Sequence, residues 1–70
     1  MQSKMRLNFY LEESGIRKSE FAKLVGVSKQ NLHDWINRRD CWVYCDDDFT
    51  VHRVEDVNVK TLFERGQVNG

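Results

Sequence analysis

The chain has 70 residues, which is enough for one small domain, and it combines 40% apolar with 31% charged residues and no proline. Its formal net charge of zero argues against the simplest nucleic-acid binders, which are basic overall, but residues 1–39 carry eight basic and four acidic side chains while residues 40–70 carry three and seven. A chain of this size buries only about 60% of its unfolded surface, so we expect oligomerisation to stabilise it.

Two short helices are predicted first. Residues 5–14 have apolar side chains at helical spacing and stop at Gly15, whereas residues 3–6 before them form either a short strand or a loose arm. Residues 18–25 form the second helix, which ends at Gly26. Its apolar side chains, all expected in the core, are Phe21, Ala22, Leu24 and Val25.

A third helix is predicted from Ser28, a good N-cap residue, to Asn37. Leu32, Trp35 and Ile36 have the i, i+3, i+4 spacing of one buried stripe. The other face is polar, and we expect it to be exposed.

Two stretches rich in aromatic and β-branched residues follow, residues 41–45 and 49–54, on either side of the acidic turn Asp46–Asp48. They predict a β-hairpin. Residues 66–70 are expected to be a disordered tail. The predicted fold is therefore one α+β domain over residues 1–65, three helices followed by a C-terminal β-hairpin, with an all-α domain as the alternative.

Residues 18–37 have the spacing of a helix-turn-helix. Ala22 is small where the two helices cross, Gly26 suits the tight turn, and Ser28 leaves the N-terminal amides of the next helix able to face a phosphate. The alternative is an ordinary helical hairpin, in which the same apolar residues are only core.

The polar face of the third helix favours DNA binding, because Gln, Asn and His side chains can read base edges and basic residues flank them. The predicted base contacts are Lys29, Gln30, His33, Asp34 and Asn37. Asp34 has a second possible role, which is to hold Arg38 four residues on. The predicted phosphate contacts are Lys18, Ser19, Lys23, Ser28, Arg38 and Arg39.

These residues resemble the Cro/repressor class of helix-turn-helix regulators, and the likeness to its small mixed α+β members covers roughly residues 4–63. Residues 22–27 resemble the turn of that class, and residues 41–54 fall where it has its hairpin. The resemblance implies a dimer on a pseudo-palindromic operator, with one third helix in each of two successive major grooves. Two departures are a longer connection from Gly15 to Ala22 and an acidic C-terminal part where the class has a basic tail.

A dimer is also expected because strand 49–54 would leave an unpaired apolar edge, which pairing with its twin covers. Leu62 and Phe63 either reach across to the partner or cover their own core. The predicted dimer interface is Phe49, Val51, Arg53, Val54, Leu62 and Phe63.

Cys41 and Cys45 lie roughly 13 Å apart in an extended strand, too far for a disulfide, so we expect reduced thiols in a cytoplasmic protein. Their spacing from His33 and His52 is not that of a zinc site, and we expect no metal or cofactor. The sequence has neither a nucleophile–base pair nor a phosphate loop, so we expect neither an enzyme nor a small-molecule substrate. No apolar run approaches the length needed to span a membrane. Two alternatives remain, a DNA-binding antitoxin with a protein partner and an excisionase-like architectural protein.

Overall fold

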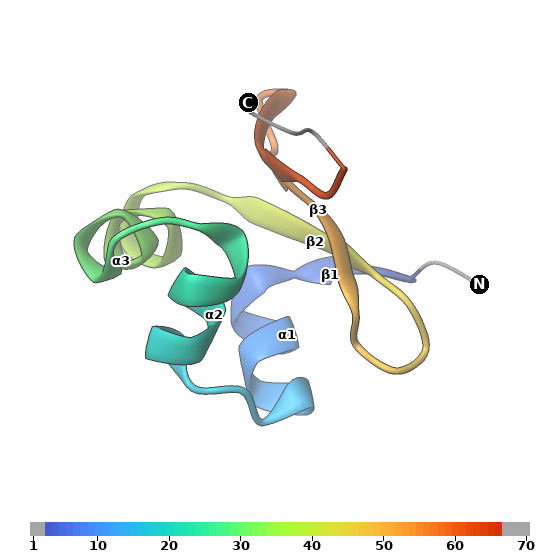
Figure 1. Cartoon of the computed structure of the whole chain (residues 1–70). Coiled ribbons are helices and arrows are strands. Elements are labelled where there is room, and N and C mark those ends of the chain that lie inside the picture. Colours follow the sequence, from blue (N-terminus) through green and yellow to red (C-terminus); the bar gives the residue numbers. More distant parts are fainter. Residues whose placement is uncertain (1–2, 67–70) are drawn as a thin grey trace.

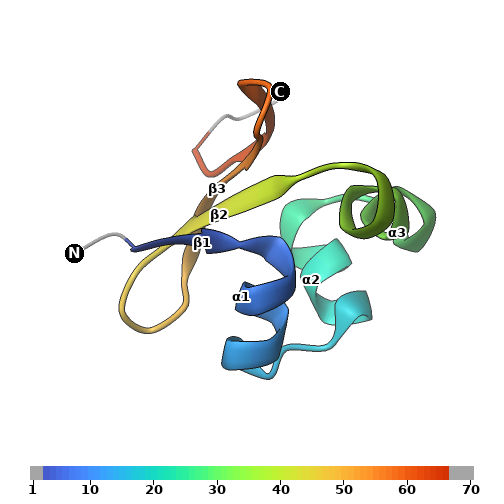
Figure 2. The same ribbon diagram turned by 180° about the vertical axis from the view of Figure 1, so that it is seen from behind.

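The structure, a computed structural model, describes residues 3–66. The order of elements is β1 (Ser3–Arg6), α1 (Leu7–Ser14), α2 (Lys18–Val25), α3 (Lys29–Arg38), β2 (Cys41–Cys45), β3 (Val51–Asp56) and β4 (Lys60–Glu64). The strands form one antiparallel sheet in the order β1-β2-β3-β4, and the helices lie together on one side of it (Figure 1, Figure 2). The α+β class is thus confirmed, and the all-α alternative is wrong.

The predicted helix boundaries follow from identifiable residues. Gly15 and Gly26 end α1 and α2 with φ of 73° and 76°, the left-handed region that favours glycine. Ser28 caps α3, and its Oγ accepts a hydrogen bond from the backbone N–H of Asn31 at 3.1 Å. The first helix starts at Leu7 instead of residue 5, because the preceding residues form β1.

The core lies between the helices and the inner face of β2 and β3. Its largest fully buried side chains come from α1, α2, α3 and both strands: Tyr10, Phe21, Leu32, Val43, Val54 and Cys45. The prediction that Leu24 belongs to the core is wrong, because its side chain is 52% exposed. At about 100° per residue, Leu24 lies roughly 100° from the centre of the buried face of α2.

The predicted hairpin is part of a larger sheet. The expected strand 49–54 begins at Val51 and ends at Asp56, and β4 pairs with it. The expectation that this strand has a free edge is therefore wrong. A bulge in the β3–β4 ladder leaves Leu62 without a Cα partner on β3.

The predicted interface residues of that strand serve the chain's own fold. Val51 and Val54 are 3% and 0% exposed. Phe49 lies before the strand, and its ring packs edge-on against Tyr10 at 5.9 Å between centroids. Arg53 forms an ion pair with Glu55. Leu62 and Phe63 are half-buried and pack against the core of their own chain, and a contact of either with a partner stays a prediction.

The turn between β3 and β4 is joined to the end of α3. The backbone N–H of Val57 donates to the carbonyl of Asp40 at 2.8 Å, and Arg39 forms an ion pair with Asp56 at 2.9 Å. Val59 closes the turn with φ of 68°. Apart from Gly66, the predicted tail 66–70 lies outside the described residues. Within residues 3–66, every helix is too short or too polar to cross a membrane.

Candidate nucleic-acid interface

Helix α3 has one buried and one exposed face. Leu32 and Trp35 anchor it in the core. On the opposite face, four of the five predicted base-contacting side chains are exposed, namely Lys29, Gln30, His33 and Asn37. Asn31 is also exposed beside Gln30, and the sequence analysis missed it. The signal was available, because Asn31 lies one residue from Gln30 on the same polar side.

The start of α2 lies against the first half of α3. A hollow of about 100 Å³ between the two helices is lined by Lys18, Lys29, Leu32, His33 and Ile36. Three predicted site residues, Lys18 of α2 and Lys29 and His33 of α3, are therefore neighbours. This is the arrangement in which a cation of the second helix can contact a phosphate while the third helix faces the bases.

Not all polar side chains of α3 are equally available to a ligand. The amide Nδ2 of Asn37 donates to the backbone carbonyl of His33 at 2.9 Å. Asp34 is half-buried and lies 3.8 Å from Arg38, four residues on, and its predicted base contact stays a prediction. Within residues 3–66, by contrast, the side chains of Lys29 and Gln30 have no hydrogen-bond or ion-pair partner.

Arg38 and Arg39 differ in their surroundings although both were predicted to contact phosphate. Arg38 is 81% exposed at the end of α3. Arg39 is held by Asp56, whose carboxylate is buried. The backbone N–H of Asn58 and the Arg39 guanidinium lower the pKa of Asp56, which therefore stays ionised as the partner of Arg39.

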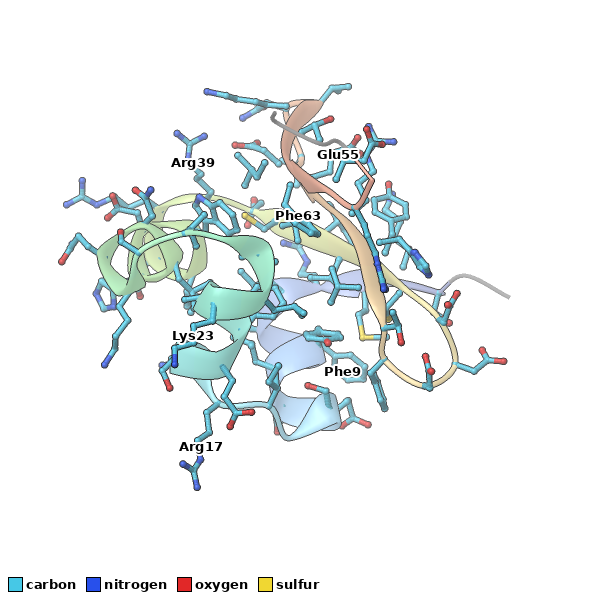
Figure 3. The ribbon with its side chains drawn as sticks, viewed as in Figure 1. Phe9, Arg17, Lys23, Arg39, Glu55 and Phe63 are labelled. Atoms are coloured by element: carbon cyan, nitrogen blue, oxygen red, sulfur yellow. The ribbon has the colours of Figure 1, made fainter. Side chains whose placement is uncertain are left out.

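The remaining phosphate candidates lie along α2 and at its ends. Ser19 and Lys23 are exposed, and Lys23 borders a groove between α2 and β4 instead of the hollow beside α3. Arg17 was missed by the sequence analysis, although it directly precedes Lys18 at the start of the helix. It is 83% exposed and 3.8 Å from Glu20. Figure 3 shows Arg17 and Lys23 both pointing away from the sheet.

The two cysteines are free thiols in the core. Burial raises the pKa of Cys41 to about 11, and burial likewise raises the pKa of Cys45. In residues 3–66, no three His, Cys, Asp or Glu side chains lie together as metal ligands would.

Comparison of the chain with protein-family models, with curated proteins and with solved structures gave no match. Its function is therefore inferred from the geometry of its own residues.

Proposed function

We propose that this chain is a sequence-specific DNA-binding regulator, a Cro-like repressor that binds a pseudo-palindromic operator as a dimer with α3 in the major groove. The observation that carries the proposal is the pairing of a firmly anchored α3 with an exposed polar face, on which the side chains of Lys29 and Gln30 have no partner within residues 3–66. An α-helix fits the major groove, where each base pair presents its own pattern of donors and acceptors.

The proposed roles follow from side-chain chemistry. Gln30 can pair with N6 and N7 of adenine through two hydrogen bonds, and Lys29 can donate to guanine. Asn37 keeps its Oδ1 and one N–H for a base while its other N–H bonds to the backbone. Lys18 and Arg38, at opposite ends of the motif, would contact phosphates and fix the register.

The distribution of charge supports the same orientation on DNA. The acidic loop Asp46–Asp48 lies at the end of the sheet away from α3 (Figure 2). DNA would repel that end and attract the basic side chains around the helix-turn-helix, so the approach with α3 leading is favoured. The proposed place of action is the cytoplasm, whose reducing conditions suit two free thiols.

The test is selection of bound DNA from a random pool, followed by footprinting of the enriched sequence. We expect a palindromic consensus with about ten base pairs between half-site centres. Gln30→Ala should reduce the difference in binding free energy between the preferred base and the other bases by roughly 1–3 kcal/mol at one position of each half-site. Asn8→Ala, which removes an exposed polar side chain from α1, is the matched control and should change nothing.

Each other outcome has a defined meaning. A pool without enrichment would refute the proposal. Enrichment of tandem sites that the protein bends would indicate an architectural protein instead of a repressor. Capture of a small basic protein without DNA enrichment would indicate an antitoxin. Unchanged base preference in Gln30→Ala would remove that residue from the interface.

A further inference from the structure

The outer face of the sheet carries two aromatic rings among cations. All three helices lie on the other side of the sheet, so nothing within residues 3–66 covers this face (Figure 1, Figure 2). In β2 the buried residues Cys41, Val43 and Cys45 alternate with Trp42 and Tyr44, which therefore point outward. The strand pairing then places the outward side chains in two rows, Lys4, Tyr44, Arg53 and Glu64 in one and Arg6, Trp42, Glu55 and Thr61 in the other.

Each of the two rings has two cations close to it. The ammonium of Lys4 lies 4.7 Å from the ring centre of Trp42 and 5.7 Å from that of Tyr44. The guanidinium of Arg6 lies 4.9 Å from the Trp42 ring, and that of Arg53 lies 5.8 Å from the Tyr44 ring. Contacts of this kind stabilise a sheet, but only weakly at exposed sites. Aromatic rings framed by cations are also the surface on which single-stranded nucleic acids stack their bases.

A hollow beside Tyr44 shows that the fold does not use all of these cationic groups. The Nε of Arg53 is buried without a hydrogen-bond partner, which is costly for a charged donor. The side chain of Arg65 is exposed and has no hydrogen-bond or ion-pair partner within residues 3–66. Two guanidinium groups with unused donors at one hollow suit a phosphate. The hollow has a volume of about 380 Å³ and is lined by Tyr44, His52, Arg53, Glu64 and Arg65.

The layout of the face favours an extended strand over a small molecule or a duplex. Sites for small molecules enclose most of their ligand, whereas the two rings lie on an open sheet surface. Trp42 and Tyr44 are two residues apart on β2, so their side chains are roughly 7 Å apart. This is about twice the 3.4 Å rise per base of a stacked strand. Successive bases must therefore leave each other to stack on the two rings, which the splayed bases of a single strand can do.

We propose that the outer face of the sheet binds single-stranded RNA. Two successive bases stack on Trp42 and Tyr44, and a phosphate lies between Arg53 and Arg65 in the hollow. The first base replaces the ammonium of Lys4, which has no hydrogen-bond or ion-pair partner within residues 3–66 and moves to the next phosphate. The exchange is favourable because a base on an aromatic ring gains more than an exposed cation does.

The two carboxylates of the face favour RNA over DNA. Glu55 forms an ion pair with Arg53 and accepts the hydroxyl of Tyr44 at 3.2 Å, so it holds that ring in place before binding. Glu64 lines the hollow and has no ion-pair partner within residues 3–66. A free carboxylate beside a phosphate is unfavourable for either nucleic acid, but in RNA it gains a hydrogen bond from the 2′-hydroxyl. The site lies across the sheet from α3, so it goes beyond the proposed function and does not depend on it.

The first test measures the Kd of a fluorescein-labelled oligouridine of about eight nucleotides by fluorescence anisotropy. Trp42→Leu keeps an apolar side chain but removes the ring, and the loss of one stacked base should raise the Kd about 5- to 150-fold. Phe9→Leu removes an exposed aromatic ring from α1 and is the matched control, which should leave the Kd unchanged (Figure 3). A wild-type chain that does not bind, or equal Kd values for the two variants, would overturn the proposal.

The second test decides the matter even where Trp42→Leu fails to fold, because it changes only exposed cations. Arg65→Gln removes a phosphate contact and should reduce the slope of log K for RNA binding against log salt concentration by about 0.7. Lys60→Gln removes an exposed cation outside the two rows and should leave that slope unchanged. A slope in Arg65→Gln equal to that of the wild type would contradict the phosphate site.

The third test compares the two nucleic acids and the two faces of the protein. An oligodeoxyuridine of the same length, which lacks only the 2′-hydroxyls, should bind several-fold more weakly than the oligouridine, and Glu64→Ala should remove that difference. Equal binding of both by the wild type would overturn the assignment to RNA. Gln30→Ala, which weakens the proposed contact with duplex DNA, should leave the Kd for RNA unchanged. A loss of RNA binding in Gln30→Ala would place the RNA on α3 and overturn the proposal.

Discussion

The link between α1 and the β2–β3 loop makes a quantitative prediction. Tyr10 is 2% exposed, and its hydroxyl donates to the carbonyl of Phe49 at 2.7 Å. Burial raises the pKa of Tyr10, so the hydroxyl remains a donor at and above neutral pH. Tyr10→Phe leaves that carbonyl without its partner, which should cost about 1.5 kcal/mol and lower the Tm by roughly 6–12 °C.

The assay is urea unfolding followed by circular dichroism, with Tyr44→Phe as the matched control. The Tyr44 hydroxyl donates to Glu55 at 3.2 Å on the outer, partly solvated face of the sheet, where water can replace it. We expect that control to cost less than about 0.5 kcal/mol. Equal losses in the two variants, or no loss in Tyr10→Phe, would refute the reasoning that burial decides the worth of these two hydrogen bonds.

Three further predictions follow from the charged and thiol groups. The lowered pKa of Asp56 means that its carboxylate stabilises the fold above the unfolded value of about 4, and that this contribution is lost as the pH falls through the folded pKa. Urea unfolding at a series of acidic pH values should therefore show a steeper loss of stability in the wild type than in Asp56→Asn, and parallel curves would contradict this. Arg38→Ala should reduce the slope of log K for DNA binding against log salt concentration by about one unit and leave the Tm unchanged. Arg39→Ala, in contrast, should lower the Tm, and the reverse pattern would exchange the roles of the two arginines. Native Cys41, buried and with its pKa raised to about 11, should react with iodoacetamide only as fast as the fold opens, so alkylation at the rate of a free thiol would be inconsistent with the packing.

The helices could be predicted from the sequence because their ends are set by single residues. Gly15 and Gly26 supply the left-handed backbone that ends a helix, and Ser28 supplies a cap. These signals are local and do not depend on tertiary contacts. The exposed polar face of α3 was predictable for the same reason, since periodicity alone separates it from Leu32 and Trp35.

The fourth strand could not be predicted in this way. The turn before β4 contains neither glycine nor proline, and Val59 adopts a positive φ that its residue type disfavours. Within β4, the apolar Leu62 and Phe63 are adjacent instead of alternating, because the bulge adds a residue there. The strand therefore depends on pairing with β3, which is a tertiary property.

Arg39 shows the same limit within the candidate site. Its position after α3 is typical of a phosphate contact, and that role stays a prediction. Its partner Asp56, however, is 17 residues away along the chain. A contact of that separation leaves no periodic signal in the sequence, so only the fold reveals that this arginine also holds the β3–β4 turn.

The pairing of β1 with β2 bears on the order in which the chain folds. Arg6 stands opposite Trp42, so all three helices lie inside one loop that this ladder closes. Closing a flexible loop of about 35 residues costs entropy, and helices that have already formed shorten it. We therefore expect the backbone amides of β1 to be the last to gain protection from hydrogen exchange during refolding. The first of the four strands in chain order would then be the last to reach its place.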